Sequence, residues 1–200
     1  MKGSLLVLGS FIMGVLVGLY HLLPDTIHNS DYTIYALATL LFLLGISIGY
    51  DKSIFTTLRR SKPVILLVPL ATIIGTLLGT ALISLLFSQY SVFDIMAVGS
   101  GFGYYSLSSI FITQYKGAEL GTIALAANII RELSTLIVAP LLVTHFGKLT
   151  PIAAGGATSL DTTLPIITRS SGTEFVFIAI FHGLMLDLSI PFLVSFLCQF

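Results

Sequence analysis

Arg131 and Glu132 stand side by side inside an otherwise apolar run that extends from about residue 120 to residue 143. A run of about 20 apolar residues is long enough to cross the hydrocarbon core of a membrane. An ionisable side chain at the centre of a membrane helix costs about 2.5–3.5 kcal/mol on insertion scales, so such residues usually face a polar interior. The segment therefore predicts a membrane helix with one polar side.

The composition also indicates an integral membrane protein. Only 9% of the 200 residues are charged and 56% are apolar, with a mean hydropathy of +1.03, whereas about 25% of residues are charged in an average protein. The net charge is zero and the basic residues form no nucleic-acid pattern, so we expect no nucleic-acid partner. The single cysteine, Cys198, excludes an intramolecular disulfide. No spacing of His, Cys and carboxylates matches a metal site, so we expect neither metal nor cofactor.

Seven apolar segments follow one another along the chain. We therefore expect an all-α, polytopic bundle of transmembrane helices that forms a single membrane domain over residues 1–200. The expected spans are residues 4–23, 33–50, 64–87, 93–114, 120–145, 151–168 and 175–197.

The basic residues predict the orientation of these spans. Four of them crowd into the connection between the second and third spans: Lys52, Arg59, Arg60 and Lys62. The loops at residues 24–31 and 88–91 contain no Lys or Arg. Cytoplasmic loops carry an excess of basic residues, so we expect a cytoplasmic N-terminus and a C-terminus outside.

Two spans are expected to be broken or re-entrant. Three glycines alternate in the first (Gly99, Gly101, Gly103), and each costs about 1 kcal/mol of helix propensity relative to Ala. The second combines Gly, hydroxyl and proline residues, among them Thr158, Ser159 and Pro165. Unwound backbone at membrane depth occurs where it is buried in protein or lines a wet cavity, as in secondary transporters. Close helix packing through small residues is the alternative.

Two carboxylates are the first candidates for chemistry, Glu132 and Asp161. A carboxylate in surroundings of low dielectric can exchange a proton for a cationic group, which is a simple device for proton-coupled export of a cation. Pro165 lies four residues after Asp161 and has no amide hydrogen, so we expect the carbonyl oxygen of Asp161 to be free for a ligand. A structural ion pair of Glu132 with Arg131 is the alternative, although adjacent helix residues do not face each other.

Four further polar residues are candidate substrate or proton ligands: Asn128, Arg131, His182 and Asp187. Arg131 either holds a substrate carboxylate or neutralises Asp161 or Glu132. Asn128 lies on the same helix face as Glu132 and either lines a pathway or makes a packing hydrogen bond. His182 either relays protons or makes an interhelical hydrogen bond. Ser106, Ser108 and His182 lack a recognised nucleophile motif, so we do not expect an enzyme.

Four ordered blocks resemble the lysine exporter LysO family: GSGFGYYSLSS at 99–109, NIIRELSTLIVAPLL at 128–142, GGATSLDTTLPII at 155–167 and HGLMLDLSIP at 182–191. The resemblance implies an exporter of L-lysine in the cell inner membrane, related in fold to cation/proton antiporters and bile-acid symporters. It also implies that Glu132 and Asp161 are the intramembrane acids needed for transport. From the proton chemistry of carboxylates we expect protons to be the exchanged ion.

Two departures from the family pattern shape the expected partners. Family members often have an acid where this chain has Asn128, so one proton-binding group is missing or has moved, for example to Asp187. Typical members also have roughly a hundred further residues, with about three spans, ahead of this region. We therefore expect a small, separately encoded membrane protein to supply these spans, or a homodimer to replace them. Export of another cation or amino acid, or a role as an assembly subunit without transport, are the competing interpretations.

Overall fold

The computed structural model describes residues 64–200 together with residues 13, 16, 17, 20, 35, 39, 42 and 46. Apart from these single positions, the expected spans 4–23 and 33–50 lie outside the described residues. The chain divides into two compact units, Met1–Phe55 and Thr56–Phe200. In the first unit the hydroxyl of Thr39 donates to the carbonyl of Tyr35 at 2.8 Å, the four-residue spacing of an α-helix.

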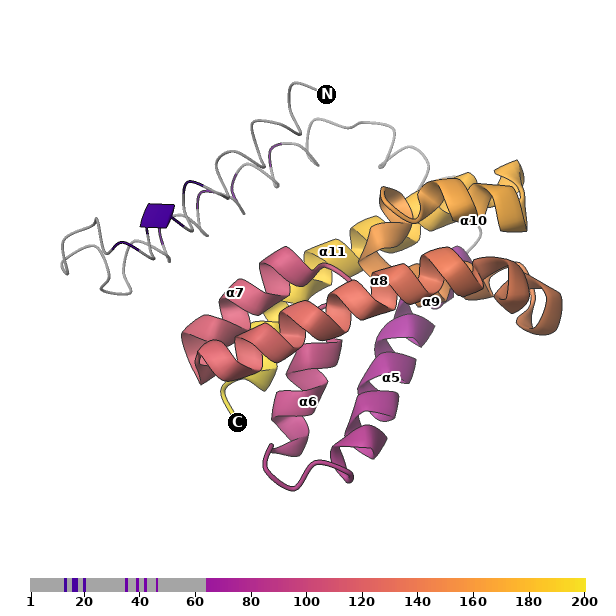
Figure 1. The fold of residues 1–200 in the computed structure, drawn as a ribbon. Coiled ribbons are helices and arrows are strands. Elements are labelled where there is room, and N and C mark those ends of the chain that lie inside the picture. The colour runs from indigo at the N-terminus through magenta and orange to yellow at the C-terminus, as the bar shows by residue number, and fades with distance from the viewer. Residues whose placement is uncertain are drawn as a thin grey trace. The chain divides into compact units, whose positions relative to one another are not determined.

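Every element in residues 64–200 is a helix, which confirms the all-α prediction for this part of the chain (Figure 1). The elements are α5 (Val64–Ser84), α6 (Val92–Gly99), α7 (Tyr105–Lys116), α8 (Ala118–Phe146), α9 (Thr150–Gly155), the 3₁₀-helix η1 (Gly156–Leu160), α10 (Leu164–Ser171), the 3₁₀-helix η2 (Thr173–Phe175) and α11 (Val176–Leu197). Within the described residues, three stretches are long and apolar enough to cross a membrane: Leu67–Ser84, Ala118–Phe146 and Thr173–Leu197.

The beginning of α6 lies close to the end of α7. A capping box starts α6, in which the Ser91 hydroxyl accepts from the Asp94 amide and the Asp94 carboxylate accepts from the Ser91 amide. The same carboxylate forms a 2.9 Å ion pair with Lys116, the last residue of α7. The rings of Phe93 and Phe200 lie 5.0 Å apart, which places the C-terminus at the same end of the unit (Figure 1). The two helices therefore form a hairpin, with residues 100–104 at its tip.

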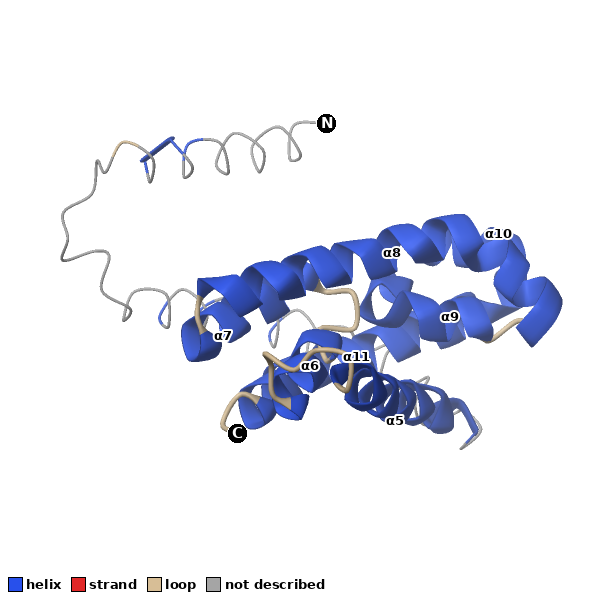
Figure 2. Cartoon of the chain, turned by 60° about the horizontal axis from the view of Figure 1, so that its bottom comes forward, coloured by secondary structure: helices blue, strands red, loops and turns tan. Residues whose placement is uncertain are grey.

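The segment from α9 to α10 has the same form at the other end of α8. Pro151 and Pro165 each lie in the first turn of their helix, where a missing amide hydrogen leaves no bond unmade. Lys148 precedes α9, and its ammonium group lies 3.1 Å from the carboxylate of Glu174, which follows α10. This segment therefore enters and returns at one end, with η1 at its tip. Figure 2 shows α8 extending between α7 and α10.

The tips of the two hairpins contact each other. The amide of Ala157 donates to the carbonyl of Phe102 at 2.8 Å, although 55 residues separate them. Gly156 makes this approach possible, since it has a φ of +66° and a Cβ there would collide with the Phe102 carbonyl. Phe102 is itself fully buried. The two segments that the sequence predicts to be irregular are therefore in direct contact.

Helix α11 packs against η1 through Gly183. A Cβ at Gly183 would lie 2.7 Å from the carbonyl oxygen of Ala157 and equally close to the backbone of Leu160. Only hydrogen at this position permits the contact, because neither neighbour is the end of a flexible side chain.

This contact leads to a stability prediction. Replacing Gly183 by Ala should lower the free energy of unfolding by about 1–3 kcal/mol, the usual effect of overpacking. Gly75→Ala is the matched control, because Gly75 also lies inside a helix but has open space around it, so this variant should be neutral or slightly stabilising. The measurement is the melting temperature of each detergent-solubilised variant. Equal melting temperatures would contradict the packing described here.

Candidate functional site

Asn128 of α8 holds the tip of the first hairpin. Its side-chain amide donates to the carbonyl of Val98 at 3.0 Å and to that of Ala124 at 2.9 Å, and its oxygen accepts from the amide of Gly103 at 2.8 Å. The residue is only 2% exposed. Asn128 thus satisfies backbone groups on both sides of the interruption between α6 and α7. This geometry is that of a packing hydrogen bond.

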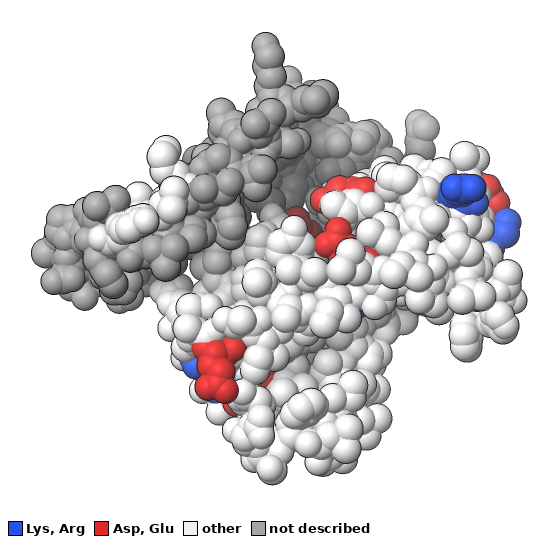
Figure 3. All heavy atoms as spheres, in the orientation of Figure 1, with Lys and Arg blue, Asp and Glu red and all other residues white. Residues whose placement is uncertain are grey.

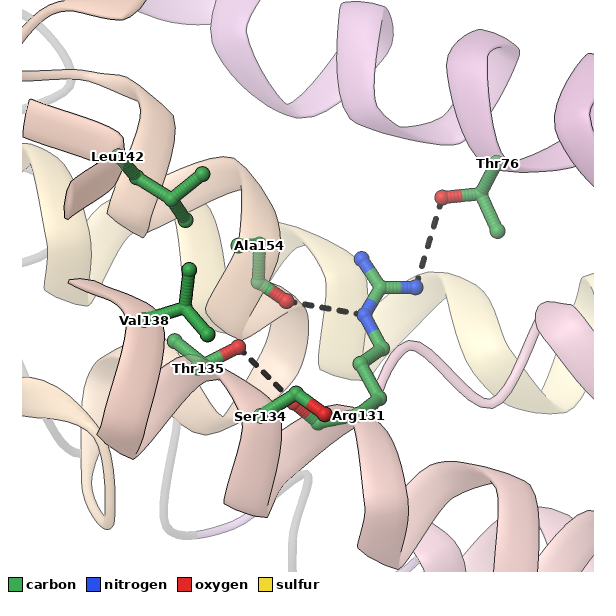
Figure 4. Close-up of a pocket in the computed structure, with 7 residues that line it drawn as sticks. All are labelled: Thr76, Arg131, Ser134, Thr135, Val138, Leu142 and Ala154. Carbon is green, nitrogen blue, oxygen red and sulfur yellow. Dashed lines mark hydrogen bonds between the residues drawn. The ribbon is translucent and has the colours of Figure 1, made fainter. Parts of the chain in front are cut away.

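Arg131 of α8 holds the second hairpin in a similar way. Its Nε donates to the carbonyl of Ala154 at 3.0 Å and its Nη2 to that of Ala153 at 3.1 Å, so the guanidinium caps the C-terminal turn of α9 (Figure 4). The guanidinium carbon also lies 5.8 Å from the ring centre of Phe102. The sequence analysis considered that Arg131 neutralises Asp161 or Glu132. Within the described residues Arg131 forms no ion pair with either of them.

A pocket of about 340 Å³ adjoins Arg131. Its lining comes from α5, α8 and α9 and comprises Thr76, Arg131, Ser134, Thr135, Val138, Leu142 and Ala154 (Figure 4). The Nη1 atom of Arg131 has only a long contact, 3.5 Å to the Thr76 hydroxyl. It is the least engaged nitrogen of the guanidinium.

His182 joins three helices at the centre of the unit. Its Nε2 lies 2.9 Å from the Thr72 hydroxyl of α5, and its Nδ1 lies 3.1 Å from the Ser159 hydroxyl of η1. The side chain is 0% exposed. Either tautomer pairs both ring nitrogens, because each hydroxyl can donate or accept. The geometry matches the interhelical hydrogen bond considered from the sequence.

Asp187 of α11 and Asp161 each lie a few residues from the contact between Gly183 of α11 and Leu160 of η1. Asp187 is 7% exposed, and its Oδ1 has no hydrogen-bond partner among the described residues. Figure 3 shows acidic side chains grouped near the middle of one face. A buried, unpaired carboxylate oxygen is costly unless a cation or proton is supplied to it.

One expectation about Asp161 is wrong. Its carbonyl oxygen is not free, because the amide of Leu164 donates to it at 3.2 Å. The sequence argument considered only the amide that Pro165 lacks, four residues on, and a turn with three-residue spacing supplies a donor instead. The side chain of Asp161 is exposed and accepts a hydrogen bond from the amide of Thr162.

Glu132 lies one turn beyond Asn128 on α8. Its side chain is half-buried and forms no hydrogen bond or ion pair within residues 64–200. Like Asp187, Glu132 therefore has no ion-pair partner in the described part of the chain.

One further group escaped the sequence analysis. Thr72, Thr76 and Thr80 recur every four residues on α5, so they share one face. They contact His182, Arg131 and Gly99 respectively, so this face supports both hairpins. The four-residue spacing of these hydroxyls in the sequence could have indicated a polar face on this helix.

These features define a class: an all-α membrane protein in which the ends of interrupted helices bring buried polar groups together. Comparison with known proteins gives the family. The model of the lysine exporter LysO family matches residues 8–198. The chain belongs to this family.

Two relatives are similar along nearly the whole chain. The lysine exporter LysO of Escherichia coli strain K12 is 33% identical over 196 residues, which cover 96% of this chain and 63% of that protein. A candidate lysine exporter of Haemophilus influenzae is 34% identical over 194 residues, which cover 96% of this chain and 97% of that protein. The chain thus spans less than two thirds of the length of the first relative. No solved structure matches it.

The contacts of Arg131 predict a large effect of its removal. Arg131→Met should leave the carbonyls of Ala153 and Ala154 without donors, and each buried group left unpaired costs about 1–3 kcal/mol. Lys148→Met is the control, since its ion pair with Glu174 is exposed and should be worth under about 1 kcal/mol. The melting temperature in detergent should fall clearly for the first variant only. A similar shift for both would argue against a capping role.

Proposed function

We propose that the protein exports L-lysine from the cytoplasm in exchange for protons. The observation that carries this proposal is the unpartnered, buried carboxylate oxygen of Asp187, one turn beyond the contact of Gly183 with η1. Such a site requires a cation or a proton to neutralise it. Membership of the lysine exporter LysO family and the names of the two relatives support lysine as the cation.

The exchange uses carboxylates that bind one cation at a time. When lysine leaves outside, protons take its place on the acids, and their release inside prepares the acids for the next lysine. Asp161 and Glu132 are the acids that take part in this cycle, with Asp187 as the buried member of the site. Asn128, Arg131 and His182 act indirectly, because their contacts hold the backbone and the helices around these acids.

The hairpins also suggest how the chain sits in the membrane. Each enters and leaves at one end of α8, so we place them as re-entrant segments from opposite faces that meet at membrane depth. Helix α5 runs toward the connection to α6, so its beginning, after the basic residues, lies on the face of Lys148 and Arg169. Both groups then obey the positive-inside rule. The C-terminus lies outside and the N-terminus inside, in the cell inner membrane.

Helix ends at membrane depth are how cation/proton antiporters and other secondary transporters expose polar groups to a substrate. The contact between two interrupted segments supports a relationship with the antiporter and bile-acid symporter fold. The proposal also keeps the expected partner, a small membrane protein or a second copy of this chain in one membrane domain with it. Resistance assays with and without a co-expressed candidate partner would distinguish the two.

The first test concerns lysine export. Bacterial cells without their own lysine exporter should become resistant to lysine-rich peptides when they express the protein. Glu132→Gln and Asp161→Asn should each reduce efflux of labelled lysine at least tenfold, because a lost hydrogen bond to a charged group is worth about 1.5–3 kcal/mol.

Glu174→Gln is the control for these variants, since Glu174 is an exposed acid at the opposite end of α10. Its efflux should equal that of the wild type. Protein abundance in the membrane is measured for every variant. If both amide variants retain full efflux, or if the wild type does not change lysine sensitivity at confirmed expression, the proposed function is wrong.

The second test concerns the re-entrant hairpins. In a Cys198→Ser background, single cysteines replace four exposed residues: Gln89, Ala118, Lys148 and Thr173. A membrane-impermeant maleimide should label positions 89 and 118 on intact cells, and positions 148 and 173 only after permeabilisation. Labelling in detergent shows that each cysteine is reactive. A full span at residues 93–114 would instead place positions 89 and 118 on opposite faces.

A further inference from the structure

The guanidinium of Arg131 divides its donors between the backbone and the pocket beside it. Its Nε and Nη2 atoms donate to the carbonyls of Ala154 and Ala153. Its Nη1 atom carries two of the five guanidinium N–H groups, and its 3.5 Å contact with the Thr76 hydroxyl is at the limit for a hydrogen bond. The group extends from α8 toward α5 at the edge of the pocket (Figure 4). Nη1 is therefore the part of Arg131 that can bind a ligand.

Two hydroxyls of the pocket can donate as well. Thr76 of α5 and Ser134 of α8 both line it, and neither hydroxyl donates to another group within residues 64–200. Thr135 differs, because its hydroxyl donates to the carbonyl of Arg131 at 2.9 Å. The pocket thus offers N–H and O–H donors from two helices, and its lining contains no acidic residue. Such a set of donors suits an oxyanion.

The charge of Arg131 has no counterion in the described part of the chain. The ion pairs there join Lys116 to Asp94 and Lys148 to Glu174. A cation in a membrane segment is costly unless other groups compensate it, and the two carbonyls of α9 do so only in part. The pocket of about 340 Å³ is in the size range of small-ligand sites. A bound anion would supply the missing negative charge.

The opposite wall of the pocket is apolar. Val138 and Leu142 follow Ser134 at four-residue intervals on α8, so the three residues share one face of the helix. Their aliphatic side chains can contact a methylene chain while Arg131 binds the charged end of the same molecule. The pocket therefore suits an oxyanion on an aliphatic chain. The carboxylate of an amino acid and the phosphate of a lipid share this chemistry.

We propose that this pocket binds the α-carboxylate of the exported lysine and so distinguishes lysine from a diamine. The acids of the proposed function recognise positive charge, which 1,5-diaminopentane, lysine without its carboxylate, also carries. Nη1 and the two hydroxyls donate to the carboxylate oxygens, which have about four lone-pair sites. A diamine leaves these donors unpaired, which is how a hydrogen-bonding site rejects an analogue that lacks the bonded group. This inference rests on the proposed function, because it takes a free amino acid as the substrate.

The test compares competitors that differ at the carboxylate. Everted membrane vesicles that contain the full chain take up labelled lysine in the presence of unlabelled lysine, lysinamide or 1,5-diaminopentane. Lysinamide keeps both amines and replaces the carboxylate by a neutral amide. Thr76→Val and Ser134→Ala each remove one donor, whereas a change of Arg131 would also uncap α9. Thr122→Val is the matched control, because Thr122 is an exposed residue of α8 whose hydroxyl donates to the carbonyl of Ala118. Melting temperature and abundance are measured for every variant.

In the wild type, the inhibition constants of lysinamide and 1,5-diaminopentane should each be at least tenfold higher than that of lysine, as loss of hydrogen bonds to a charged group predicts. Thr76→Val and Ser134→Ala should each raise the KM for lysine about tenfold and leave the inhibition constant of lysinamide unchanged. The preference for lysine over lysinamide should therefore fall. Thr122→Val should change neither value.

Equal inhibition by lysine and lysinamide in the wild type would overturn the inference, even if the hydroxyl variants misfolded. An unchanged preference in both folded hydroxyl variants would also overturn it, and is the result expected if a lipid phosphate occupies the pocket. A wild type without lysine uptake would instead refute the proposed function.

Discussion

Wherever a helix stops inside this protein, its backbone amides and carbonyls need partners that water does not supply. The amide of Ala157 donates to the carbonyl of Phe102, and two side chains of α8 provide further partners. Asn128 pairs with groups on both sides of one interruption, and Arg131 pairs with the last carbonyls of α9. The interrupted segments keep their conformation because these partners are present.

This requirement divides the polar residues of the interior into two groups. Asn128, Arg131 and His182 have most of their hydrogen-bonding groups occupied by backbone or by hydroxyls of neighbouring helices. Asp187, by contrast, keeps one oxygen without a partner in the described part of the chain. Their sequence neighbourhoods are alike, since each stands as a polar residue in an apolar helix. Only the three-dimensional contacts separate a scaffold residue from a candidate ligand.

The sequence predicted the helical class because this class depends on local composition. The stretch 120–145 lies within α8, and the glycines at 99, 101 and 103 fall where α6 gives way to α7. Contacts between residues far apart in the chain could not be predicted from the sequence. Nothing local relates Phe102 to Ala157, or Asp94 to Lys116, so neither the hairpin form nor the contact of the tips could be derived.

Asn128 and Arg131 are three residues apart on α8, about 4.5 Å along the helix axis. Asn128 binds the tip of the hairpin that begins at one end of the unit, and Arg131 binds the end of α9 in the hairpin that begins at the opposite end. Because α8 is bound to both hairpins, a shift of α8 along its axis would move both hairpin tips in the same direction. The two hairpins begin at opposite ends of α8. The same shift would therefore draw one tip back toward the end where its hairpin begins and move the other tip further from the end where its hairpin begins.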